Sequence, residues 1–133
     1  MLLALAEQQG IRSDVIPAIA TGFCGGLSHS GNLCGAVSGA VMGLGLAFGR
    51  QTPQDSRDPA FTAVQTFLAR FAARFGSLTC LELTGCHLGT PEGKEKFQQN
   101  KASIDCAGFV SQAARLASEL ILAGQKERTD ESN

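Results

Sequence analysis

The chain has 133 residues and a formal net charge of −1, with 11 Lys and Arg against 12 Asp and Glu. This length is typical of one domain, so we expect a single helical domain over residues 1–133. The balanced charge and the absence of Trp and Tyr argue against a nucleic-acid partner, because such proteins use basic surfaces and aromatic stacking platforms.

The first half of the chain predicts helices separated by a glycine-rich loop. Its expected elements are, in order, a helix over Met1–Gln9, a short helix over Asp14–Thr21 capped by Ser13, a loop over Gly22–Asn32 and a helix over Cys34–Gly49. In the last of these helices, Gly35, Gly39 and Gly43 share one face, because residues four apart are neighbours on a helix. This smooth face lets a helix, a loop or a ligand approach closely, so Gly35 and Gly39 are candidate cofactor-binding residues.

The second half of the chain predicts four more helical segments. They are a helix over Asp58–Phe75 ended by Gly76, a helical turn over Ser77–Thr84, a short helix from Thr90-Pro91 to about Asn100, and a last helix over Ser103–Ala123 ended by Gly124. Arg50–Arg57 is expected to be a polar loop and Gln125–Asn133 a frayed polar tail. The last helix is expected to turn Cys106, Phe109 and Val110 inward. No segment alternates as a half-buried strand does, so the predicted class is all-α: a small helical bundle with a Gly/Ala-rich central helix.

The longest stretch without charged residues is too interrupted to predict a membrane span. Val15–Gly49 has no Asp, Glu, Lys or Arg, but Pro17 and the run Gly25–Asn32 break it. The remaining Leu33–Phe48 falls short of the roughly 20 residues that a spanning helix needs, so we expect a buried core helix. The N-terminus lacks a basic signal-peptide region. Five cysteines without a signal peptide predict a reducing compartment, and we expect the protein to be cytoplasmic.

Three cysteines share one predicted setting at the start of a helix. Each follows a candidate cap by two or three residues: Cys34 follows Asn32, Cys80 follows Ser77 and Cys106 follows Ser103. Free backbone N–H groups and the helix dipole favour a thiolate there, and thiolates are the nucleophiles of disulfide exchange. We therefore predict that Cys34, Cys80 and Cys106 are catalytic residues clustered around one site, with at least one lowered thiol pKa.

A metal centre is the second chemistry that these cysteines suggest. No C-x-x-C pair is present, so a metal or disulfide site must be assembled from distant segments. Iron–sulfur clusters and structural zinc usually take four protein ligands. The candidate metal ligands are therefore all five cysteines: Cys24, Cys34, Cys80, Cys86 and Cys106. His29 and His87 are either further ligands or solvated loop residues.

The segment Cys34-Gly35-Ala36-Val37-Ser38-Gly39 resembles the hallmark of the C_GCAxxG_C_C family of redox-active proteins. The likeness covers nearly the whole chain, and it implies that Cys80 and Cys106 match the family's third and fourth cysteines. The family's first cysteine, expected just before a stretch like Leu2–Leu5, has no counterpart in this sequence, either because the start is truncated or because the protein lacks this thiol. Cys24 and Cys86 are additional. A site that needs all four family cysteines is expected to be incomplete here.

Three kinds of function remain open at this point. The resemblance and the cysteines favour redox chemistry with an unidentified redox partner, either by thiol–disulfide exchange or by electron transfer at an iron–sulfur or zinc centre. The alternative is a binding or assembly module, for example a homodimer, in which the glycine face packs a helix of a second chain and the cysteines are structural. A carrier of a small ligand on the glycine-rich loop is the third.

Overall fold

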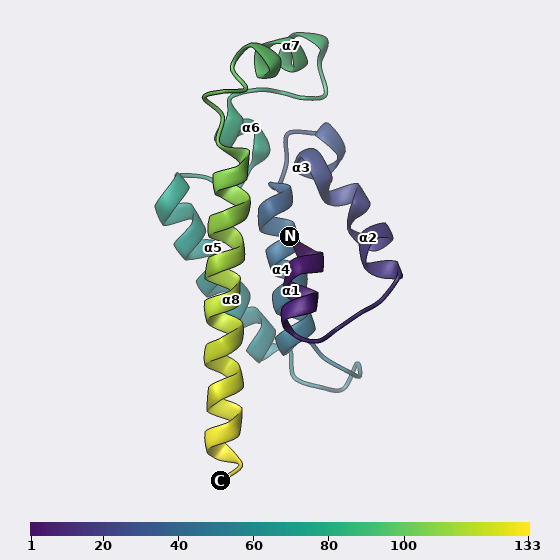
Figure 1. Cartoon of the computed structure of the whole chain (residues 1–133), viewed down its shortest axis with the longest axis vertical. Coiled ribbons are helices and arrows are strands. Elements are labelled where there is room, and N and C mark those ends of the chain that lie inside the picture. Colours follow the sequence, from purple (N-terminus) through teal and green to yellow (C-terminus); the bar gives the residue numbers. More distant parts are fainter.

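The computed structural model describes residues 1–133, and its regular elements are helices (Figure 1). They are α1 (Leu2–Gln8), α2 (Val15–Ala20), a 3-10 turn (Thr21–Phe23), α3 (Cys24–His29), α4 (Gly35–Phe48), α5 (Asp58–Phe75), α6 (Cys80–Thr84), α7 (Pro91–Gln99) and α8 (Cys106–Glu131). The predicted all-α class is confirmed. None of these helices combines the length and the apolar character that crossing a membrane requires.

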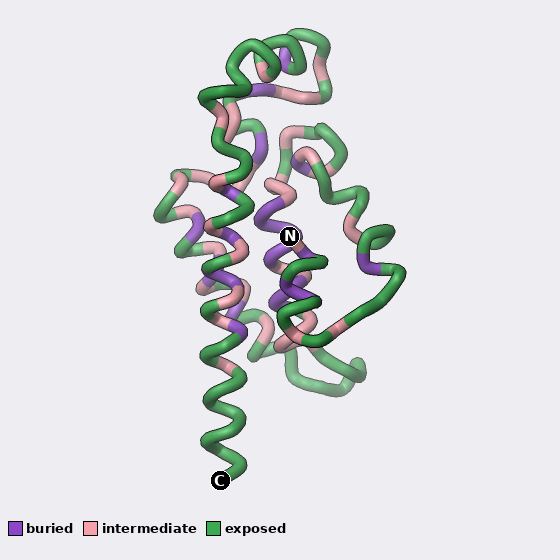
Figure 2. Tube along the Cα trace, viewed as in Figure 1, coloured by how far each residue is buried: buried purple, intermediate pink, exposed green.

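The closed core lies where α4, α5 and α8 pack together, and α1 covers α4 from the side (Figures 1 and 2). Its fully buried side chains include Leu44 of α4, Phe67 and Phe71 of α5, and Ile121 of α8. Phe67 and Phe71 are four residues apart, so they face the same side of α5, and their ring centroids lie 6.0 Å apart. Burial of these large apolar side chains is the main source of stability in the fold.

The glycine face of α4 is filled by α1 of the same chain. A Cβ atom on Gly39 would lie 2.8 Å from Cβ of Met1, and one on Gly43 would lie 2.9 Å from Cβ of Leu5. Contacts this short do not occur between ordinary side chains, so the two glycines are what lets α1 approach. In this chain the N-terminal helix occupies the face that the assembly alternative assigns to a helix of a second chain.

Helix α8 is longer than its sequence predicts. It continues through Gly124 to Glu131, so the expected helix end at Gly124 and the frayed tail are both wrong. Gly124 serves a close contact instead of a helix end, since a Cβ atom there would lie 2.7 Å from Cζ of Phe48. Arg128 then ties the extension to α4, because its Nη1 donates to the carbonyl of Ala47 at 3.2 Å and its guanidinium lies 5.7 Å from the Phe48 ring centroid.

The predicted glycine-rich loop is instead an ordered turn with left-handed backbone. Gly25 and Gly26 have φ of 63° and 67°, and Leu27, Ser28 and His29 continue with φ of 50°, 56° and 68°. Such a conformation costs a non-glycine residue about 1–2 kcal/mol. The turn is held by a hydrogen bond of 2.8 Å from Oγ of Ser28 to the carbonyl of Gly22. It brings Gly26 against Cys80, where no side chain fits, because a Cβ atom on Gly26 would overlap Cβ of Cys80.

Candidate functional site

A short antiparallel backbone contact joins the start of α4 to the start of α6. The N–H of Cys34 donates to the carbonyl of Leu78 at 2.9 Å, and the N–H of Cys80 donates to the carbonyl of Asn32 at 2.7 Å. Cys34 and Cys80 therefore each follow this two-stranded contact directly, at the point where α4 and α6 begin. This is how the fold brings together two thiols that are 46 positions apart in the sequence.

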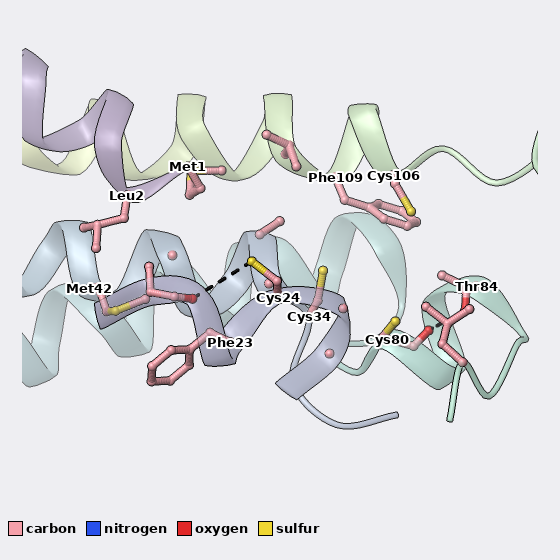
Figure 3. A pocket seen from close by; sticks show the side chains of 18 of the residues that line it. Met1, Leu2, Phe23, Cys24, Cys34, Met42, Cys80, Thr84, Cys106 and Phe109 are labelled. Atoms are coloured by element: carbon pink, nitrogen blue, oxygen red, sulfur yellow. Dashed lines mark hydrogen bonds between the residues drawn. The ribbon is translucent and has the colours of Figure 1, made fainter. Parts of the chain in front are cut away.

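Four of the five cysteines line one cavity of about 400 Å³, shown in Figure 3. Cys34 comes from the start of α4, Cys80 from α6, Cys106 from α8 and Cys24 from the start of α3. Cys80 is 8% exposed and Cys34 is half-buried, whereas Cys24 and Cys106 are exposed. The thiols are thus distributed from the exposed rim of the cavity to its buried floor. Cys86 is buried and lies outside this lining.

The rest of the cavity wall is apolar, and sequence reasoning did not identify most of it. Its side chains come from both halves of the chain and include Met1, Leu2, Phe23, Met42, Leu88, Phe97, Phe109 and Val110. None of the lining residues is Asp, Glu, Lys, Arg or His, and Thr84 is the single polar side chain besides the thiols. Nothing in the local patterns of these apolar residues distinguishes a cavity wall from a core.

The start of α4 leaves backbone donors free beside Cys34. Cys34 itself occupies the N-cap position and no side chain caps this helix, so the expected cap at Asn32 is wrong. The Asn32 side chain instead donates to Oγ of Ser30 at 2.9 Å. The first intrahelical bond runs from Ser38 to the carbonyl of Cys34, and the N–H groups of Gly35, Ala36 and Val37 have no hydrogen-bond partner. Free N–H groups at the start of a 14-residue helix favour a nearby negative charge.

The start of α6 has its donors already occupied. Thr79 is the cap, and its Oγ1 accepts from the N–H of Glu82 at 3.3 Å. The expected cap, Ser77, is wrong, because its Oγ instead accepts from the N–H of Thr79 at 3.1 Å. The N–H of Cys80 is also bonded, to the carbonyl of Asn32. Cys80 thus sits in a first helical turn without the free donors that its position predicts.

The start of α8 is capped by a carboxylate. Oδ1 of Asp105 accepts from the N–H of Gly108 at 2.9 Å, so the expected cap at Ser103 is wrong. Ser103 instead donates from its Oγ to the carbonyl of Asn100 at 2.8 Å. Asp is among the strongest cap residues, so the position of Asp105 just before Cys106 could have identified the true cap from the sequence. Cys106 is exposed rather than inward, and Val110 is 43% exposed.

Burial raises the pKa of the Cys80 thiol, and the nearby charges of Cys34 and Cys106 raise it further. Burial also raises the pKa of the Cys106 thiol, followed by the charges of Cys34 and Asp105. The expectation that helix starts lower the thiol pKa is therefore wrong for these two cysteines. The apolar surroundings disfavour the charged form of each thiol, and mutual repulsion among the clustered sulfurs adds to this effect. Cys34 is the thiol that contributes to both shifts.

Gly35 and Gly39 both line the cavity. The space beside each is filled by this chain, since a Cβ atom on Gly35 would lie 3.3 Å from the carbonyl oxygen of Phe23 and one on Gly39 would meet Met1. Their role in binding a cofactor stays a prediction.

The arrangement does not fit the metal centre that the cysteines suggest. No group of three or more His, Cys, Asp or Glu side chains is placed so that it could hold a metal ion. An iron–sulfur cluster or a structural zinc ion would need four such ligands. The assignment of the five cysteines as metal ligands stays a prediction.

Comparison with known proteins identifies a family. The family model described as "Putative redox-active protein (C_GCAxxG_C_C)" matches residues 1–120. The match spans most of the chain, so the chain belongs to this family, as the resemblance indicated. No curated protein and no solved structure matches the chain.

Proposed function

As a member of this family, the chain acts, we propose, by thiol–disulfide exchange, with Cys34 as the attacking thiol and Cys80 as the resolving thiol. The sulfur of Cys34 attacks one sulfur of a substrate disulfide, forms a mixed disulfide and releases the other half of the substrate as a thiolate. Cys80 then gives up its proton and attacks the Cys34 sulfur. This second step releases the remaining half as a thiol and leaves a Cys34–Cys80 disulfide, so the substrate gains the two electrons that the two cysteines lose.

The difference between the three helix starts carries the assignment of Cys34. Beside Cys34, three backbone N–H groups are free and no acidic side chain caps the helix. At α6 the donors are occupied, and at α8 the cap is the carboxylate of Asp105. A thiolate is the reactive form in disulfide exchange, and free helix donors stabilise it. The start of α4 is therefore the most favourable of the three positions for the attacking sulfur.

The geometry of the exchange supports Cys80 as the resolving thiol. Displacement at sulfur needs the attacking and leaving sulfurs on opposite sides of the central one. A substrate that enters from the rim leaves toward the rim, so the second attack comes from the floor, where Cys80 lies. The raised pKa of Cys80 disfavours its thiolate in the reduced site, and conversion of Cys34 to a mixed disulfide removes one of the charges that raise this pKa.

Single replacements of the cysteines test the proposal. The Cys34→Ser variant should lose the reaction with a small disulfide in the cavity, and the Cys80→Ser variant should stop at a mixed disulfide on Cys34. Intact-mass and peptide mass spectrometry after mixing with excess disulfide distinguish these products. The Cys86→Ala variant is the control. Cys86 is buried outside the cavity lining, so its replacement should leave the products unchanged.

Two results would contradict this mechanism. One is an unchanged rate of disulfide reduction in the Cys34→Ser variant. The other is closure of a Cys34–Cys106 disulfide in the wild type, which would transfer the resolving role to Cys106 at the rim.

A further inference from the structure

The cavity around Cys34 has no charged side chain that could pair with a charge on a ligand. Its lining contains no acidic side chain, no basic side chain and no histidine. The hydroxyl of Thr84 is already used, because it donates to the carbonyl of Cys80 at 2.7 Å and accepts from the N–H of Cys86 at 3.2 Å. Beyond the thiols, the wall consists of aliphatic, aromatic and thioether side chains.

From this lining we propose that the cavity binds an uncharged, apolar small molecule, and that the substrate of the exchange is an uncharged, apolar disulfide. The statement about the substrate rests on the proposed function, whereas the statement about binding rests on the cavity alone. The volume of about 400 Å³ falls in the range of small-molecule sites, which is roughly 300–1,000 Å³. It does not admit a folded partner.

Desolvation is the physical basis of this selectivity. A charged disulfide, such as that of a tripeptide thiol with free carboxylates, would lose hydration on entering and would find no ion partner inside. The loss is costly, because a charge buried without a partner is strongly unfavourable. An apolar disulfide instead gains from burial against Met42, Phe97 and Phe109, and the thioether of Met42 adapts to irregular ligands.

The rim of the cavity is apolar as well, so apolar ligands are favoured at its entrance as well as inside it. Phe23 and Val110 line the cavity and are 37% and 43% exposed. An exposed side chain at the rim is a suitable position for a test, since a replacement there leaves the closed core untouched. Leu122 offers a matched control: it lies on the same helix α8, is 55% exposed and does not line the cavity.

Binding is tested without any thiol reaction by titrating the reduced protein with neutral N-phenylnaphthylamine, whose fluorescence rises in apolar surroundings. The wild type should bind the probe, and the Val110→Lys variant should bind it about tenfold more weakly because a charge then stands at the rim. The Leu122→Lys variant should bind as the wild type does. Absence of binding, or equal binding by the Val110→Lys variant, would overturn the inference.

Reactivity is tested with two chromogenic disulfides of opposite character, neutral dithiodipyridine and dianionic dithiobis(nitrobenzoate). The rate of modification of Cys34, read from its peptide by mass spectrometry, is divided for each reagent by the rate with N-acetylcysteine amide. The normalised rate should favour the neutral reagent by at least about tenfold, and the Val110→Lys variant should reduce this preference. A normalised preference for the dianion in the wild type would overturn the proposed substrate class.

The two measurements separate this inference from the proposed function. If Cys34 reacts with neither reagent but the wild type binds the fluorescent probe and the Val110→Lys variant does not, the exchange mechanism fails and the binding inference holds. If Cys34 reacts with both reagents equally and no probe binds, the exchange mechanism holds and the inference about apolar ligands fails.

Discussion

The start of α4 and the remainder of the same helix lie in two very different surroundings. At its start, Cys34 faces a cavity with other thiols, free backbone donors and an apolar wall. Further along, Val37 and Leu44 are fully buried in the closed core with α5 and α8. Figure 2 shows this contrast as a run of buried positions along α4, with partly buried positions at its start. One helix thus carries the proposed attacking thiol at one end and many of the core contacts along the rest.

This comparison teaches that the chemistry and the stability of the protein can be separated by mutation. A cavity that admits ligands forgoes packing contacts, and contact with partner atoms is what stabilises a core. The fold compensates by packing the rest of α4 closely on α1, α5 and α8. Replacements in the closed core should therefore change the free energy of unfolding, whereas replacements at the cavity should change reactivity.

The largest expected effect comes from the Phe71→Ala replacement in the closed core. Phe71 is fully buried, and its ring centroid lies 4.8 Å from that of Phe75. Loss of this ring should lower the free energy of unfolding by about 3–5 kcal/mol, measured by urea denaturation. The Phe61→Ala variant is the control on the same helix, because Phe61 is 52% exposed and should lose less than about 1 kcal/mol. Equal losses of unfolding free energy in the two variants would mean that burial in the closed core is not the main source of stability.

An intermediate effect is expected from the Gly43→Ala replacement on the face that α1 covers. The added Cβ atom would lie 2.9 Å from Cβ of Leu5, so α1 must move away, at a cost of about 1–3 kcal/mol. Gly45 lies on the same helix with open space beside it, and Gly45→Ala should stabilise by about 0.5–1 kcal/mol. Thermal unfolding of the two variants compares the faces directly. A stabilising Gly43→Ala change would show that α1 does not pack on α4 in solution.

The sequence predicted the helices well because their signals are local. For α5, apolar periodicity, Pro59 in the first turn and the left-handed Gly76 at φ 82° are all local signals, although no side chain caps the start of this helix. The same kind of rule failed at Gly124, because the choice between a helix end and a close contact depends on the distant ring of Phe48. The left-handed backbone at Leu27, Ser28 and His29 was also beyond reach, since it depends on tertiary contacts that outweigh local preference.

The candidate site shows the same division between local and distant information. The placement of Cys34, Cys80 and Cys106 at helix starts follows from local patterns, and the structure shows it although all three expected caps are wrong. The raised pKa values of Cys80 and Cys106 could not be predicted, because burial and the neighbouring thiols come from other segments. The apolar wall of the cavity could not be predicted either, because its residues are spread along the chain from Met1 to Val110.

The smallest expected effect sharpens the comparison between the start of α4 and the start of α8. The carboxylate of Asp105 is one cause of the raised pKa of the Cys106 thiol, after burial and the charge of Cys34. The Asp105→Asn replacement removes this charge and keeps a good cap, so the pKa of Cys106 should fall. More thiolate is then present at neutral pH, and alkylation of Cys106 by iodoacetamide should become roughly two- to fivefold faster. The alkylation rate of Cys34 should stay the same.

The Asp58→Asn variant, altered at the start of a different helix, is the control. A pH profile for Cys106 that stays in place or shifts upward would mean that the acidic cap does not set α8 apart from α4, and the choice of Cys34 as the attacking thiol would lose one of its supports.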